Sequence, residues 1–162
     1  MTTPWVVGPE PDQTISYGPA LDQVIEFYEG DGSLVTLIHG GYWRPIHTRE
    51  HMRALAAKLV KHGFRVANIE YRRDPGNPDK LFDDVNVALS HLKESIALIG
   101  FSVGGQLALV SKSDAHKLIL LAPITDLKRT KLEGLGEGAV DTFYGVQDLT
   151  EYDPMLKEYE GH

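Results

Sequence analysis

The stretch of sequence that decides the fold is SIALIGFSVGGQLALVSKS, residues 95–113. A run of strand-forming residues gives way here to a helix-like pattern, and a serine stands between glycines at the junction. Residues 100–104, GFSVG, fit the pattern G-x-S-x-G, in which a tight strand-to-helix turn pushes the hydroxyl of Ser102 out above a sheet. Glycines on either side of the serine let neighbouring backbone pack where a Cβ would clash. A glycine-rich turn with an N-capping serine is the alternative interpretation of the same residues.

Apolar runs and helical patterns alternate along the rest of the chain. The expected strands are residues 34–40, 64–71, 96–101 and 117–123, and the expected helices are residues 49–63, 79–94 and 104–113. The strands are continuous apolar runs, as in parallel sheets that helices cover on both faces. This order predicts an α/β fold with a mostly parallel, doubly wound sheet. Residues 14–18 and 23–29 flank a turn-favouring PALD and predict an antiparallel N-terminal hairpin.

A second motif, HGGYW at residues 39–43, follows the first of these parallel strands. In open α/β sheets the functional residues lie beyond the carboxyl ends of the strands, so this motif and the Ser102 turn belong to one candidate site. A serine that attacks a carbonyl needs donors for the oxyanion, and small residues after a strand let backbone N–H groups face that oxygen. We expect His39 to orient this loop through side-chain hydrogen bonds. Two interpretations stay open for Tyr42 and Trp43, which either pack in the core or line an acyl or aromatic pocket.

HGGYW, EYRRDPGNPDKLFDDVNVAL and GFSVGG together resemble the α/β-hydrolase fold. Within that fold they resemble the esterase and arylformamidase (kynurenine formamidase-like) branch, whose members carry an HGGxW loop. The resemblance implies a serine hydrolase that cleaves a small carboxylic ester or amide, with aryl formamides among the candidates, through an acyl-serine intermediate. Ser102 would be the nucleophile, and Gly41, Tyr42 and Val103 would be the backbone oxyanion donors. Gly40 and Trp43 would orient the loop with His39, and no metal or organic cofactor is implied.

The catalytic acid and base are harder to place than the nucleophile. This fold arranges its triad in the order Ser, Asp or Glu, His, but the residues after Pro123 show only helix-like and turn-like patterns. The C-terminal strands that should carry the acid and the base are therefore missing. Asp126 is the best-placed acid, although a helix N-cap is the alternative role. His162 would be the base only if the tail folds back onto the site.

Other titratable residues have simpler expected roles. His116 begins a strand and so lies at the wrong end of the sheet. We expect Asp153 to be a turn or cap residue. The histidines on or beside helices are expected at the surface, and the pair of aspartates is expected to be a solvated helix start; these residues are His47, His51, His62 and His91, and Asp83 and Asp84.

Three explanations remain open for the missing strands. The chain is a truncated hydrolase, a natural short form that binds a ligand or partner, or a compact hydrolase with a rearranged triad. In each case we expect a single domain over residues 1–162, C-terminally incomplete relative to the fold. Its last strand would then be an exposed edge, which predicts a homo-oligomer formed by edge pairing.

Composition excludes several other classes of function. The net charge is -7 and basic residues are scattered, so no nucleic-acid footprint is visible. The absence of cysteine excludes disulfides, a cysteine nucleophile and a thiolate metal site. The first residues lack a signal-peptide pattern, and no apolar run approaches the roughly 18 residues of a membrane span. We expect a soluble, cytoplasmic protein that acts on a small molecule. A nucleotide-binding domain is disfavoured, because no G-x-G-x-x-G follows the first strand and GFSVGG lacks a phosphate-binding lysine.

Overall fold

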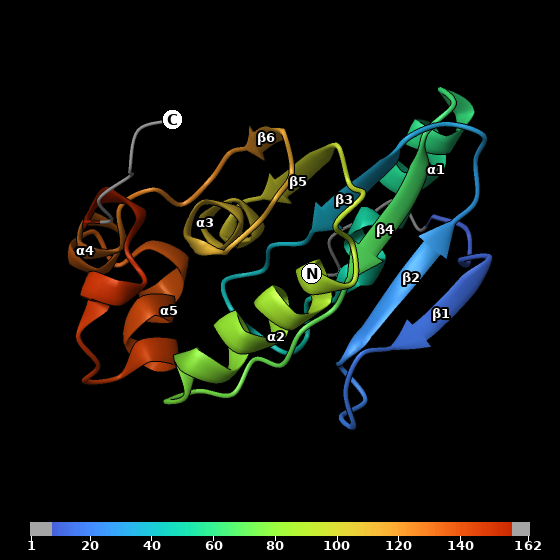
Figure 1. Ribbon diagram of the computed structural model, residues 1–162. Helices are drawn as coiled ribbons and strands as arrows, with labels where there is room; N and C mark the ends of the chain where they lie inside the picture. The colour runs from blue at the N-terminus through green and yellow to red at the C-terminus, as the bar shows by residue number, and fades with distance from the viewer. Residues whose placement is uncertain (1–7, 157–162) are drawn as a thin grey trace.

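The computed structural model describes residues 8–156. Its centre is a six-stranded sheet in the order β1-β2-β4-β3-β5-β6 (Figure 1). The strands are β1 Gln13–Ser16, β2 Val24–Tyr28, β3 Leu34–Ile38, β4 Arg65–Ile69, β5 Ala97–Phe101 and β6 Lys117–Leu121. Strands β3, β4, β5 and β6 run parallel, whereas β1 pairs antiparallel with β2, which pairs antiparallel with β4. The predicted mostly parallel sheet with an N-terminal hairpin is confirmed.

The helices cover both faces of the sheet and extend beyond it. The first segment comprises η1 Arg49–Met52 and α1 Arg53–Lys61, and the second and third are α2 Pro78–Ser90 and α3 Val103–Val110. After β6 come α4 Leu127–Leu132, α5 Leu135–Tyr144, η2 Leu149–Glu151 and η3 Pro154–Leu156. Figure 1 shows α4 and α5 at the end of the molecule opposite the β1–β2 hairpin. No helix among residues 8–156 is long and apolar enough to cross a membrane.

Two hydrophobic cores lie on opposite faces of the sheet. In β3, Leu34 and Ile38 join the core formed with α2, α3 and α5, while Val35 and Leu37 join the core formed with α1. All residues of β3 are buried for this reason, which explains the continuous apolar run in its sequence.

The β6 edge of the sheet is open in the described part of the chain. Strand β6 pairs with β5, and its apolar side chains remain partly accessible, with Leu118 46%, Ile119 43% and Leu121 40% exposed. Between residue 122 and residue 156 the chain forms only helices and connecting segments. The prediction that the C-terminal strands of the fold are missing is therefore confirmed for the described residues.

The predicted solvated helix start at Asp83 and Asp84 is wrong for Asp84. Helix α2 begins earlier, at Pro78, and Asp84 is buried. Its carboxylate accepts hydrogen bonds from the Arg72 guanidinium at 2.7 and 2.8 Å and from Gln23 Nε2 at 2.7 Å. A buried carboxylate is tolerated when charged and polar donors satisfy it in this way.

Candidate active site

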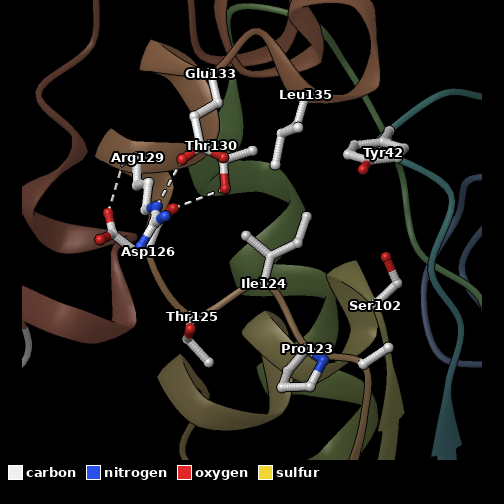
Figure 2. A pocket seen from close by; sticks show the side chains of 11 residues that line it. Tyr42, Ser102, Pro123, Ile124, Thr125, Asp126, Arg129, Thr130, Glu133 and Leu135 are labelled. Atoms are coloured by element: carbon white, nitrogen blue, oxygen red, sulfur yellow. Dashed lines mark hydrogen bonds and ion pairs between the residues drawn. The ribbon is translucent and has the colours of Figure 1, made fainter.

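Ser102 occupies a strained turn between β5 and α3. Its backbone angles are φ 54 and ψ -115, a region that costs a residue with a side chain about 1–3 kcal/mol. The Ser102 N–H donates to Leu121 O at 2.9 Å, and Ser102 O accepts from the Ile124 N–H at 3.3 Å, so the end of β6 holds the turn. Figure 2 shows the Ser102 hydroxyl pointing toward the side of a pocket on which Tyr42 lies. Val103 begins α3, so its N–H lies at the helix N-terminus, where the helix dipole favours negative charge.

The glycines of the G-x-S-x-G pattern are required by close backbone contacts. A Cβ at Gly100 would lie 2.3 Å from Gly104 O, and a Cβ at Gly104 would lie 2.0 Å from Ile38 O. Neither distance is sterically allowed. The turn can therefore form against β3 only because both positions lack a side chain.

The HGGYW loop lies directly against the Ser102 turn. A Cβ at Gly40 would lie 2.8 Å from Ser102 Cβ and 2.6 Å from Phe101 O. The next residues, Gly41, Tyr42 and Trp43, have φ values of 121, 49 and 58. Since three successive residues adopt positive φ, the backbone curls after β3 instead of continuing along it, and the Arg44 N–H donates to Gly41 O at 3.0 Å to close the curl.

His39 lies beneath this loop, outside the cavities that Ser102 lines. It is fully buried, its Nδ1 lies 2.7 Å from Gly40 O, and its Nε2 lies 2.7 Å from Glu70 Oε1. The ring stacks on Tyr71 with centroids 4.5 Å apart, and the Tyr71 hydroxyl donates to His39 O at 2.7 Å. These contacts hold the backbone of the loop from below.

Glu70 is a buried site residue that the sequence analysis missed. Its carboxylate pairs with His39 and with Arg73, whose guanidinium is also buried. Burial alone would raise the pKa of Glu70, but the charge and hydrogen bond of His39 and the charge of Arg73 outweigh burial and hold this pKa well below its usual range. Glu70 is therefore ionised at neutral pH. The only signal in the sequence is that it directly follows β4, the strand next to β3.

Tyr42 and Trp43 have different environments although they are adjacent. The Trp43 ring is 2% exposed and packs on Phe143, with centroids 5.7 Å apart and planes 13° apart. Tyr42 instead lines the cavities beside Ser102, and a Cβ at Gly136 would lie 2.5 Å from its ring. Of the two interpretations, Trp43 therefore packs in the core, whereas Tyr42 lines a pocket.

Two cavities meet at Tyr42 and Ser102. The larger, of about 340 Å³, extends under α4 (Figure 2). It is lined by Tyr42, Ser102, Ala122, Pro123, Ile124, Thr125, Asp126, Arg129, Thr130, Glu133 and Leu135. The smaller, of about 200 Å³, lies on the side of η1 and is lined by Gly40, Gly41, Tyr42, His47, His51, Phe101 and Ser102.

The prediction that His47 and His51 are surface residues is wrong. Both are half-buried and line the smaller cavity with Ser102, and their rings lie 5.1 Å apart. Burial lowers the pKa of each imidazole; Arg44 lowers that of His47 further, and His47 lowers that of His51. Both rings are therefore neutral at pH 7. The sequence signal that could have identified them is their position just after HGGYW, at the carboxyl end of β3.

The remaining predicted residues are not gathered beside Ser102 as a triad. Asp126 lines the larger cavity but serves as the N-cap of α4, with Oδ1 accepting from the Arg129 N–H at 2.8 Å. Asp153 is buried and accepts from the N–H groups of Leu127 and Lys128, a capping role. His116 is exposed and precedes β6, at the opposite end of the sheet from Ser102.

His62 and His91 are exposed, as predicted. His162 lies outside the described residues. Within residues 8–156, no group of three or more His, Cys, Asp or Glu side chains could hold a metal ion.

The strand order, the Ser102 turn and the loop packed against it define an α/β-hydrolase fold. The BD-FAE family model matches residues 26–160, and the chain belongs to that family. No curated protein matches the sequence.

Solved structures with a similar fold come from several sources. A proposed thioesterase from a Silicibacter species has a TM-score of 0.72 and 20% identity, with 91% of this chain and 63% of that chain covered. EstE7, an HSL homologue from a metagenome library, has a TM-score of 0.70 and 20% identity, with 93% and 63% covered. Esterase B from Lactobacillus rhamnosis has a TM-score of 0.69 and 19% identity, with 92% and 62% covered. The chain thus spans less than two thirds of the length of these structures.

Proposed function

We propose that the chain carries the nucleophile and the oxyanion hole of a carboxylic ester hydrolase. The observation that carries this proposal is the contact of Gly40 with Ser102, which sets the HGGYW loop beside a serine on a strained turn. Ser102 Oγ attacks the carbonyl carbon of the substrate, and the N–H groups of Gly41, Tyr42 and Val103 donate to the oxyanion. The alcohol leaves, and water then hydrolyses the acyl-serine.

Esters are the preferred substrate class because similar folds belong to proteins named as esterases. The two cavities on either side of Ser102 support a substrate whose acyl and alcohol parts extend in different directions. An aryl formamide is the narrower candidate, and it rests on the likeness of HGGYW to the arylformamidase loop.

The base of this reaction is proposed among three histidines. His162 is the candidate that follows the chain order of the fold. His47 and His51 are the candidates that share a cavity with Ser102, and as neutral imidazoles they can accept a proton. Asp126 is the proposed acid. In that role its carboxylate would have to give up the hydrogen bond that caps α4 and accept one from an imidazole instead.

A binding domain without catalysis is the second candidate function. It is favoured by Asp126, whose carboxylate oxygen already caps a helix. In this case the same two cavities would hold a small molecule, and Ser102 would be a turn residue without special reactivity.

Covalent labelling separates these two functions. A fluorophosphonate probe should react with the wild-type chain and not with Ser102→Ala, because the probe requires an activated serine. The variants His162→Gln, His47→Gln and His51→Gln then identify the base, as the one whose loss slows labelling most, with His91→Gln as the exposed control. A folded wild-type chain that stays unlabelled supports the binding domain and contradicts the hydrolase.

A further inference from the structure

We propose that Glu70 is a positioning residue, whose carboxylate fixes the oxyanion loop against Ser102 through His39. This inference rests on the proposed function for its catalytic consequence. Glu70 touches neither cavity, so its effect must pass through the residues it holds.

Both carboxylate oxygens of Glu70 are occupied by donors from different parts of the fold. Oε1 accepts from His39 Nε2 at 2.7 Å, from the Tyr71 N–H at 3.1 Å and from Arg73 Nη1. Oε2 accepts from the Arg49 N–H at 3.0 Å. Because the side chain is fully buried, water cannot replace any of these donors. Glu70 therefore ties the end of β4 to β3, to the start of η1 and to the segment that follows β4.

The His39 ring connects this carboxylate to the loop. Its Nδ1 bonds Gly40 O on the side opposite Glu70, and Gly40 packs so closely on Ser102 that a Cβ at Gly40 would lie 2.8 Å from Ser102 Cβ. A rotation of the ring would displace the Gly40 peptide. The N–H groups of the next residues, which are the proposed oxyanion donors, would move with it.

A carboxylate is required at this position, and an amide of the same shape would not serve. The two ring nitrogens of His39 lie 2.7 Å from Gly40 O and 2.7 Å from Glu70 Oε1, and a carboxylate oxygen can only accept. Arg73 and two backbone N–H groups donate to the same carboxylate. A glutamine would turn an NH₂ group toward one of these donors and would leave the buried Arg73 cation without its counter-charge.

Asp84 provides a matched control for the stabilising part of this role. It is also buried and also satisfies an arginine, with hydrogen bonds to the backbone and guanidinium of Arg72. It lies on α2, and its carboxylate bonds Gln23 and Arg72 rather than the loop at 39–43. Loss of either carboxylate should therefore destabilise the fold, but only loss of Glu70 should loosen the loop.

The test compares Glu70→Gln with Asp84→Asn in the full 162-residue chain. Backbone amide exchange at residues 40–43, measured by NMR, should accelerate at least about tenfold in Glu70→Gln and stay at the wild-type rate in Asp84→Asn. With 4-nitrophenyl acetate, kcat should fall by about 100-fold in Glu70→Gln with little change in KM, the loss typical of reacting groups misplaced by about 1 Å. Glu70→Asp, which keeps the charge, should recover part of both losses and serves in place of Glu70→Gln if that variant does not fold.

Equal rates of amide exchange at residues 40–43 in Glu70→Gln and Asp84→Asn would overturn the proposal. An unchanged kcat in Glu70→Gln would also overturn it. A wild-type chain that does not hydrolyse the ester would contradict the proposed function alone. The exchange measurement would still decide whether Glu70 holds the loop.

Discussion

Adding one methyl group at Gly104 should disable the site while leaving the sheet formed. In the structure this residue faces the end of β3, and a Cβ would lie 2.0 Å from Ile38 O and 2.6 Å from His39 O. Both atoms belong to the backbone, so no side-chain rotation can relieve the contact. The strand and the Ser102 turn must separate for Gly104→Ala to fold.

The size of this effect follows from the distance. An ordinary contact begins at 3.4 Å, so the turn and β3 must separate by more than roughly 1 Å in an interior that is close-packed. Over-packing of this kind costs about 1–3 kcal/mol of stability, or a decrease in Tm of about 2–12 °C for a chain of this size. A shift of about 1 Å between the proposed nucleophile and the proposed oxyanion donors should lower the rate by about 100-fold.

The assay combines thermal unfolding with the rate of fluorophosphonate labelling. Gly63→Ala is the control, because Gly63 has φ 90 with open space around it and lies between α1 and β4, at the other end of the sheet. It should lose about 1–2 kcal/mol from its backbone conformation and keep its labelling rate. Wild-type labelling of Gly104→Ala, or an equal loss of labelling in Gly63→Ala, would refute the close-contact argument.

Three further outcomes follow from packing, charge and the open edge. Trp43→Ala should lose about 3–5 kcal/mol of stability in denaturant unfolding, because the indole is buried against Phe143; a loss below 1 kcal/mol would contradict this packing. The pKa values of Glu26 and Glu70 are lowered in the folded chain. The stability that these two ionised carboxylates contribute to the fold is therefore fully present above the unfolded pKa of about 4.3, and it is lost as pH falls through their folded pKa values. The stability difference between wild type and Glu70→Gln should therefore shrink between pH 5 and pH 2, and a constant difference would be inconsistent with it. Ile119→Lys should weaken self-association in sedimentation, because charge on an exposed edge strand opposes its pairing with the edge strand of another chain. A wild-type chain that is already monomeric would contradict the predicted dimer.

The sequence predicted the fold well because its signals are local. Strand and helix patterns alternate, and the glycines around Ser102 mark a turn that only particular residues permit. The helices of residues 49–63 and 79–94 were predicted within a few residues of their observed bounds. The apolar residues that recur along these helices are the ones that pack into the two hydrophobic cores of the structure.

The charged part of the site could not be predicted, because its partners are distant in the sequence. Glu70 meets His39 across 31 positions, and Asp84 was misplaced because its partner Arg72 lies outside α2. His47 and His51 precede or begin a helix, where a surface position is the usual outcome. Cytoplasmic location, edge pairing and the role of His162 stay predictions.

The geometry of the site follows from the pairing of β3 with β5. Ile38 is in register with Gly100 in this parallel pair, so both strands end at the same edge of the sheet. The residues that follow the two strands therefore lie against each other, with little space between their backbones. Glycine at positions 40 and 104 allows this packing, because a Cβ at either position would clash with the other segment. The Ser102 hydroxyl and the loop amides are thus brought together by backbone contact, while side chains such as Glu70 and His39 only hold the contact in place. Substitutions that add atoms between the two strand ends should therefore damage the site more than substitutions that remove atoms from the cavity walls.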